Sequence, residues 1–312
     1  EYKADEVVIS VGGKQSIFNL CLAILEYGDE VIIPAPYWVS YTDIVNLTGA
    51  SPVVIACDIN QSFKITPSQL EQNISKKTKL VFLNSPSNPT GAVYSDSELR
   101  GLADVLIKYP QVYIGTDDIY EHINLSGKPF NNILMIEPRL KDRVIILNGV
   151  SKAYSMTGWR IGFAAGPKVI ISAMSKLQSQ STSNPTSISQ VAAEAALNGG
   201  KDCMVPMIKA FKDRHDFVLE KLNNIEGFNC IPAEGAFYAF TDANQAIKNL
   251  FTANKIKSLD DLSFTEYLLE SQGVAVVPGS AFGLEGYFRI SFATSMKNLV
   301  EALRRIKLAI EG

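Results

Sequence analysis

Residues 7–24 read Val-Val-Ile-Ser-Val-Gly-Gly-Lys-Gln-Ser-Ile-Phe-Asn-Leu-Cys-Leu-Ala-Ile, and this stretch decides the fold class. Its β-branched run predicts a short strand that ends at Gly12 and Gly13. Apolar residues then recur at the spacing of one helix face, at Ile17, Leu20, Cys21 and Ile24, and we expect the helix to end at Gly28 and Asp29. The stretch therefore predicts a strand-turn-helix unit, the repeating element of a parallel α/β sheet.

The same alternation of apolar runs and helical segments continues to about Gly200. The runs that we expect to form strands lie at residues 7–10, 31–33, 52–55, 80–83, 112–115, 144–147 and 161–165. This pattern predicts an α/β fold, with a mainly parallel sheet sandwiched by helices.

The C-terminal third has a different pattern. Strands are expected at 228–231, 237–240, 274–277 and 288–292, and a final helix has its apolar face at Leu299, Leu303, Ile306 and Ile310. A long helix from about Met204 to Leu222 leads into this region. We therefore predict two domains, a large one at residues 1–205 and a smaller α+β domain at 206–312.

Composition narrows the class of partner. The 312 residues are 46% hydrophobic and 20% charged, with a net charge of −3 and no long run of like charge, which argues against nucleic acid and membrane surfaces. No apolar stretch approaches the roughly 20 residues of a membrane helix. The four cysteines lack CxxC spacing and there are two histidines, so we expect no metal site, reduced thiols and a cytoplasmic location. Small molecules are the expected partners.

Polar and glycine-rich clusters follow five of the predicted strands, at residues 12–14, 37–38, 84–91, 117–120 and 148–152. Because the carboxyl ends of parallel strands share one edge of a sheet, we expect these clusters to converge on one ligand site. At the first cluster, Gly12, Gly13 and Lys14 join a strand to a helix, where free amides and the positive helix end favour an anion such as phosphate. A tight turn without a ligand is the alternative.

Lys152 lies in the cluster after the sixth strand and is the candidate nucleophile. A lysine in a desolvated site near other cations loses its proton more readily, which permits imine formation with an aldehyde. Arg160 follows as a second candidate phosphate ligand. The alternative for both residues is a solvated surface cation.

Asp117 follows a strand that we expect to be buried on both faces, so its carboxylate needs a cationic partner. A protonated pyridine nitrogen would serve, and a helix N-cap is the alternative. Trp38 could stack on a ring or fill the core, and Asn88 before Pro89 could be only a turn residue.

Taken together, these motifs resemble the class I aminotransferases of fold type I, and most closely the bacterial aspartate aminotransferases. The resemblance runs from Glu1 to Gly312. The motifs that carry it are Ser-Val-Gly-Gly-Lys-Gln, Pro-Tyr-Trp-Val-Ser-Tyr, Asn-Ser-Pro-Ser-Asn-Pro-Thr-Gly, Asp-Asp-Ile-Tyr-Glu-His, Ser-Lys-Ala-Tyr-Ser-Met-Thr-Gly-Trp-Arg-Ile-Gly and Phe-Arg-Ile-Ser-Phe-Ala.

The resemblance implies pyridoxal 5'-phosphate as cofactor and assigns roles around it. It implies that Lys152 forms the Schiff base and moves the substrate proton, and that Asp117 pairs with the pyridine nitrogen. Tyr120 and Asn88 would bond the ring oxygen. The remaining roles are stacking by Trp38, phosphate binding by Gly12, Gly13, Lys14, Ser151 and Arg160, and binding of the substrate α-carboxylate by Arg289 as a bidentate fork. Trp38 and Asn88 would also contact the substrate.

The implied reaction passes an amino group from an L-amino acid, which we expect to be aspartate, to a 2-oxo acid such as 2-oxoglutarate through pyridoxamine phosphate. Aromatic, alanine or prephenate transamination, a β-lyase, and an aminotransferase-like sensor domain of a transcription regulator are the alternatives. The family also implies a homodimer with shared sites. It further implies an N-terminal arm, which we expect this chain to lack. Gly149 stands where relatives often carry a hydroxyl residue near the phosphate.

Overall fold

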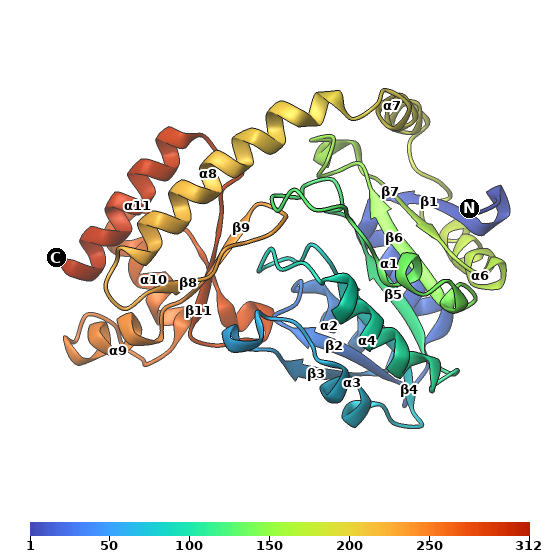
Figure 1. The fold of residues 1–312 in the computed structure, drawn as a ribbon, viewed down its shortest axis with the longest axis horizontal. Helices are drawn as coiled ribbons and strands as arrows, with labels where there is room; N and C mark the ends of the chain where they lie inside the picture. Colours follow the sequence, from blue (N-terminus) through green and yellow to red (C-terminus); the bar gives the residue numbers. More distant parts are fainter.

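The computed structural model describes all 312 residues, and two β-sheets organise them (Figure 1). The larger sheet has seven strands in the order β1-β7-β6-β5-β4-β2-β3. These are β1 (Val7–Val11), β2 (Glu30–Ala35), β3 (Ser51–Ala56), β4 (Thr78–Asn84), β5 (Tyr113–Asp117), β6 (Val144–Gly149) and β7 (Ile161–Ala165). All seven lie where the sequence predicts a strand, with ends that differ by a few residues.

The direction of β7 departs from a fully parallel sheet. β2, β3, β4, β5 and β6 pair in parallel, whereas β7 pairs antiparallel with both β6 and β1. The connection from β6 to β7 is the segment around Lys152, which turns back without a crossover helix. The strand therefore returns in the opposite direction.

Helices cover both faces of this sheet, because its strands are apolar on both sides. On one face, α1 (Gly13–Ile24), α2 (Ser40–Leu47) and α6 (Lys168–Ser179) pack on a buried cluster that includes Val31, Phe82 and Leu147. On the other face, α3 (Pro67–Asn73), α4 (Asp96–Ile107) and α5 (Ile133–Ile136) pack on a cluster that includes Ile32, Val81 and Ile114. The expected sandwich of helices around a mainly parallel sheet is present.

The first helix is shorter than we predicted. Residues Ile17, Leu20 and Cys21 are buried as expected, but α1 ends at Ile24 and Leu25 is already extended. The prediction that the helix reaches Gly28 and Asp29 is therefore wrong. Leu25 is itself buried, at 8% exposure. The helix therefore ends before the last apolar side chain that packs into the core.

The smaller sheet has four antiparallel strands in the order β10-β11-β9-β8, formed by β8 (Asn229–Cys230), β9 (Tyr238–Asp242), β10 (Val277–Pro278) and β11 (Tyr287–Ser291). Its helices are α9 (Asn244–Thr252), α10 (Asp261–Gln272) and α11 (Met296–Glu311). The long helix α8 (Val205–Asn223) connects it to α7 (Ser187–Asn198) beside the larger sheet (Figure 1). We propose a domain division at residues 205 and 206, where α8 begins.

One segment of the N-terminal region packs with the C-terminal core. Tyr120, Ile123 and Leu125, which follow β5, are buried in the same cluster as Phe211, Phe288 and Leu303. Backbone bonds reinforce this contact, since the amides of Glu234 and Gly235 both donate to the carbonyl of Gly91. The two sheets are thus joined firmly where a cavity opens between them.

Candidate active site

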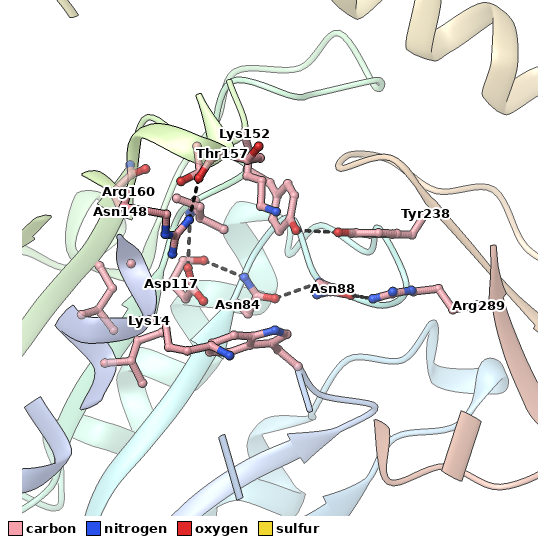
Figure 2. A pocket seen from close by; sticks show the side chains of 17 residues that line it. Lys14, Asn84, Asn88, Asp117, Asn148, Lys152, Thr157, Arg160, Tyr238 and Arg289 are labelled. Atoms are coloured by element: carbon pink, nitrogen blue, oxygen red, sulfur yellow. Dashed lines mark hydrogen bonds between the residues drawn. The ribbon is translucent and has the colours of Figure 1, made fainter. Parts of the chain in front are cut away.

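A cavity of about 330 Å³ lies at the carboxyl ends of the parallel strands, facing the smaller sheet (Figure 2). Ten of the eleven residues that the sequence singles out line it: Gly13, Lys14, Trp38, Asn88, Asp117, Tyr120, Ser151, Lys152, Arg160 and Arg289. The eleventh, Gly12, precedes Gly13 and lies against the guanidinium of Arg160. The expected convergence of the strand-end clusters is therefore present in the fold.

Lys152 enters the cavity from the loop after β6. Its Nζ lies 5.9 Å from the centroid of the Tyr120 ring and 5.8 Å from that of Phe237. Burial lowers the pKa of Lys152, and the positive charges of Arg160 and Arg289 lower it further, while the negative charge of Asp117 opposes them. A lysine held in this way has a larger share of neutral amine, the form that attacks a carbonyl carbon.

Asp117 ends β5 and is buried at 7% exposure. Its Oδ2 accepts a 2.6 Å hydrogen bond from the hydroxyl of Tyr41, and its Oδ1 accepts a 3.3 Å bond from the backbone N–H of Ile119. Burial raises the pKa of Asp117, although these bonds and the charge of Lys152 act in the opposite direction. A cation bound in the cavity would complete the environment that an ionised Asp117 requires.

The neighbouring Asp118 does not line the cavity. Its two carboxyl oxygens accept hydrogen bonds from Thr116 Oγ1 at 2.6 Å and from Asn132 Nδ2 at 2.7 Å. Burial raises the pKa of Asp118 well above its usual range. Asp118 is therefore held by these two side chains, and Asp117 is the carboxylate that faces the cavity.

A chain of amide contacts links Asp117 to Arg289 (Figure 2). Asn84 Nδ2 donates to the carbonyl of Asp117 at 2.8 Å, and Asn84 Oδ1 accepts from the backbone N–H of Asn88 at 2.8 Å. Arg289 Nη1 then donates to Asn88 Oδ1 at 2.7 Å. Because Oδ1 of Asn88 is occupied by the arginine, its amide nitrogen stays available to donate to a ligand.

Arg289 comes from β11 of the smaller sheet. The carbon of its guanidinium lies 4.5 Å from the ring centroid of Tyr238 and 4.8 Å from that of Phe282. Burial lowers the pKa of Arg289, and its Nε is buried without a hydrogen-bond partner. A planar cation with unused donors, held between two rings, is suited to a carboxylate.

The opposite end of the cavity combines glycines, the start of a helix and a cation. Gly12 has a φ of +79° and caps the N-terminus of α1, and a Cβ at this position would collide with the guanidinium of Arg160. A Cβ at Gly162 would collide with the backbone of Gly12 and Gly13. These glycines let the helix start and Arg160 approach closely, so free amides and a cation meet at one point.

Lys14 lies nearby, with Nζ 5.0 Å from the ring centroid of Trp38. Trp38 also contacts Tyr41 edge-on, at 5.4 Å between ring centroids. The indole therefore forms one wall of the cavity, with a cation beside it.

Gly149 has a structural reason to lack a hydroxyl side chain. A Cβ there would lie 2.8 Å from the carbonyl oxygen of Ile161 and 3.0 Å from the Cα of Gly162. Thr157 and Ser151 line the cavity instead. Arg160 Nη1 also donates to the carbonyl of Thr157 at 2.8 Å, which holds this segment against the anion end.

Several residues of the site were given no role from the sequence, among them Tyr41, Asn84, Thr157 and Tyr238. The first three lie within quoted motifs, and that position was the only signal for them. Tyr238 had none, because a tyrosine in an apolar strand is typical of a core.

The chain matches known proteins along nearly its full length. A family model described as aminotransferase class I and II matches residues 1–306. An aspartate/prephenate aminotransferase of Nitrosomonas europaea is 58% identical over 306 residues, which cover 98% of this chain and 77% of that protein.

Two solved structures extend this comparison. The crystal structure of the aspartate aminotransferase from Rhizobium meliloti has a TM-score of 0.95 at 48% identity, over 99% of this chain and 77% of that one. An aromatic aminotransferase from Pyrococcus horikoshii also matches, with a TM-score of 0.90 at 34% identity, over 98% and 79% of the two chains. Proteins named for different amino acids therefore share this fold.

Proposed function

Because this chain belongs to the class I and II aminotransferase family, we propose that it transfers the amino group of L-aspartate to a 2-oxo acid such as 2-oxoglutarate, with pyridoxal 5'-phosphate as cofactor. The family match also confirms the predicted α/β fold class. The observation that carries the proposal is the meeting of Lys152, Asp117 and Arg289 in one cavity. None of the three forms a salt bridge with another side chain of the protein.

The residues present fit this cofactor. Buried Asp117 matches a protonated pyridine nitrogen, and the anion end formed by Gly13, Ser151 and Arg160 matches a phosphate. Gly12 and Lys14 support that end, the indole of Trp38 offers a stacking face, and Tyr120 with Asn88 offers donors to the ring oxygen. When bound, pyridoxal phosphate supplies an aldehyde that accepts amino groups and a ring that withdraws electrons from the substrate α-carbon.

We assign two tasks to Lys152. As a neutral amine it would hold the cofactor through its aldehyde, and the same amine would serve as the base that accepts and later gives up the proton of the substrate α-carbon. The lowered pKa of Lys152 supports both tasks, since each requires the unprotonated form.

Arg289 binds the α-carboxylate in this proposal. Its fork can form two parallel hydrogen bonds with a carboxylate, and the rings of Tyr238 and Phe282 limit its movement. Asn88, bonded to Arg289, connects this end of the substrate to the cofactor side of the cavity.

The names of the relatives support aspartate as donor, and the Nitrosomonas protein's name pairs aspartate with prephenate. Prephenate is therefore the alternative acceptor to test beside 2-oxoglutarate. Aromatic and alanine donors and β-elimination remain alternatives that a substrate panel distinguishes.

We also propose a homodimer with shared sites. Helix α7 has exposed apolar side chains, with Ile188 at 72%, Val191 at 65% and Leu197 at 48% exposure, beside a groove along β1 and β7. An apolar surface of this kind favours a second copy of the chain. We also propose a cytoplasmic location, which the free thiols of all four cysteines support. None of the helices combines the length and the hydropathy of a membrane span.

The decisive experiment adds pyridoxal phosphate to the purified protein and follows absorbance, then measures amino transfer from aspartate to 2-oxoglutarate and to prephenate. We expect a visible band that borohydride traps on Lys152, and amino transfer that requires this lysine. Lys176→Ala is the matched control, because Lys176 is exposed on α6. A protein that binds the cofactor but transfers no amino group to any 2-oxo acid would contradict the proposal.

A further inference from the structure

Tyr238 is the one phenol of the smaller sheet that reaches the cavity. It begins β9, is buried at 6% exposure, and its hydroxyl lies 2.9 Å from the hydroxyl of Tyr120 (Figure 2). Tyr120 follows β5 of the larger sheet, 118 positions earlier in the chain. The bond therefore joins two side chains that only the packing of one sheet against the other brings together.

The ring of Tyr238 makes a second contact, with Arg289. The guanidinium carbon lies 4.5 Å from the Tyr238 centroid, and Phe282 contacts it at 4.8 Å. Tyr238 and Arg289 come from the paired strands β9 and β11, in which Ser291 stands opposite Tyr238 and Phe240 opposite Arg289. One side chain thus touches both the expected carboxylate anchor and the expected donor to the cofactor ring.

We propose that Tyr238 is a positioning residue that couples these two sites. It donates a hydrogen bond to Tyr120, so that Tyr120 directs its own proton into the cavity, and its ring holds Arg289 ready for the substrate carboxylate. This inference rests on the proposed function, because it concerns a ligand at Arg289 and an acceptor at Tyr120.

Either phenol can donate in this bond, and we take the direction in which Tyr238 is the donor. Each phenol has one proton, and the two oxygens share one hydrogen bond. If Tyr238 gives its proton to that bond, Tyr120 keeps its own for an acceptor in the cavity, and successive O–H donors strengthen one another. Burial raises the pKa of both phenols, so both are neutral donors in the range where the enzyme would work.

The coupling follows from charge. With Arg289 unpaired, a positive charge lies over the Tyr238 ring and makes its O–H a better donor. A carboxylate bound to Arg289 neutralises that charge, which weakens the donor and hence the bond that Tyr120 gives to the cavity. Substrate binding at the smaller sheet is thereby transmitted to the cofactor ring of the larger sheet.

Tyr238→Phe distinguishes the effect of the hydroxyl from the effect of the ring, because it removes the hydrogen-bond donor and keeps the ring contact with Arg289. In the pyridoxal-phosphate-loaded protein, we expect the pH midpoint of the visible absorbance to move from the wild-type value. Succinate is a dicarboxylate without an amino or oxo group, so it can occupy Arg289 without reacting. We expect saturating succinate to shift the wild-type midpoint further, and this second shift should be smaller by at least about half in Tyr238→Phe. We expect kcat to fall by about three- to tenfold with KM within about twofold.

Tyr238→Leu removes the ring as well. Its KM for amino and oxo acids should rise by about tenfold, because Arg289 loses one of its two supporting rings. Tyr287→Phe is the matched control. Tyr287 is a buried tyrosine of β11 that stacks on Phe240 outside the cavity, so its loss of a hydroxyl should leave both absorbance titrations at wild-type values.

Two results would overturn the inference while leaving the proposed function intact. One is a Tyr238→Phe protein whose absorbance titrates as in the wild type, with and without succinate. The other is an equal change in Tyr287→Phe, which would indicate a general effect on the smaller sheet. Failure of the proposed function would appear in the wild type itself, which would form no absorbing adduct and transfer no amino group, and that result overturns both.

Discussion

The hydroxyl of Tyr41 lies 2.6 Å from Oδ2 of Asp117, so the buried carboxylate that faces the cavity has a neutral donor behind it. Tyr41 is itself fixed, since its ring stacks on Phe82 with 4.6 Å between centroids and 7° between planes. The donor therefore holds the carboxylate in one orientation, and its removal should change the charge state of Asp117 more than the shape of the site.

Tyr41→Phe should raise the pKa of Asp117. A hydrogen bond to an ionised group is worth roughly 1.5–3 kcal/mol, and about 1.4 kcal/mol corresponds to one pKa unit. Asp117 then ionises only at higher pH, so the acid limb of kcat/KM should move upward by about one pH unit. Tyr94→Phe is the control, because Tyr94 is a buried tyrosine whose hydroxyl accepts a bond from Ile65 N–H. An unchanged acid limb would show that Tyr41 only fills space.

Lys152→Ala should abolish amino transfer, with a loss of at least about a hundredfold, because no other lysine lines the cavity beyond Lys14 at its opposite wall. The visible absorbance of the lysine-bound cofactor and the peptide labelled by borohydride should disappear together. Cofactor can still bind through the anion end. If borohydride still labelled this peptide in the Lys152→Ala protein, the cofactor would be attached to another residue.

Asp117→Asn should lower kcat by at least about a hundredfold, since it removes the charge that keeps a pyridine nitrogen protonated. Asp118→Asn should change kcat by no more than about threefold, because Asp118 contacts Thr116 and Asn132 below the cavity. Steady-state kinetics of the two variants provides the measurement. The reverse order of defects would mean that Asp118 is the functional carboxylate.

Without cofactor, the same Asp117→Asn change should stabilise the protein. Burial raises the folded-state pKa of Asp117, so the free energy of unfolding falls as pH rises through that pKa and the carboxyl ionises. The amide carries no such cost. Thermal melting of the cofactor-free proteins should show a Tm about 2 °C higher for the variant at pH 8. A gain of about 1 kcal/mol in the free energy of unfolding would have this effect. Near pH 3, where the carboxyl is protonated, the variant should show no gain in Tm. A gain that is the same at both pH values would exclude ionisation as the cause.

Arg289→Lys should weaken the binding of every amino and oxo acid, because a point ammonium cannot form two parallel bonds to a carboxylate. The loss of one charge-assisted bond predicts a fall in kcat/KM of at least about tenfold. The absorbance of bound cofactor should stay normal. The fall should be similar for aspartate, glutamate and aromatic donors, and a defect limited to acidic donors would mean that Arg289 contacts the side chain.

The sequence alone determined the order of the strands along the chain and the polar residues that follow them. Those features depend on local periodicity and short motifs, such as the strand and glycine pair ending at Gly13. They point to Lys152 and Asp117, and the family resemblance adds Arg289. The family match and the fold confirm the predicted family and fold class. The roles of the individual residues stay predictions.

The tertiary structure alone decided which residues support that site. The direction of β7, the early end of α1, the crowded position of Gly149 and the packing of Tyr120 into the C-terminal core were not visible in the sequence. The bonds from Tyr41 to Asp117 and from Tyr238 to Tyr120 span 76 and 118 positions. Such contacts depend on strand order and on how one sheet packs against the other, and local pattern does not encode either.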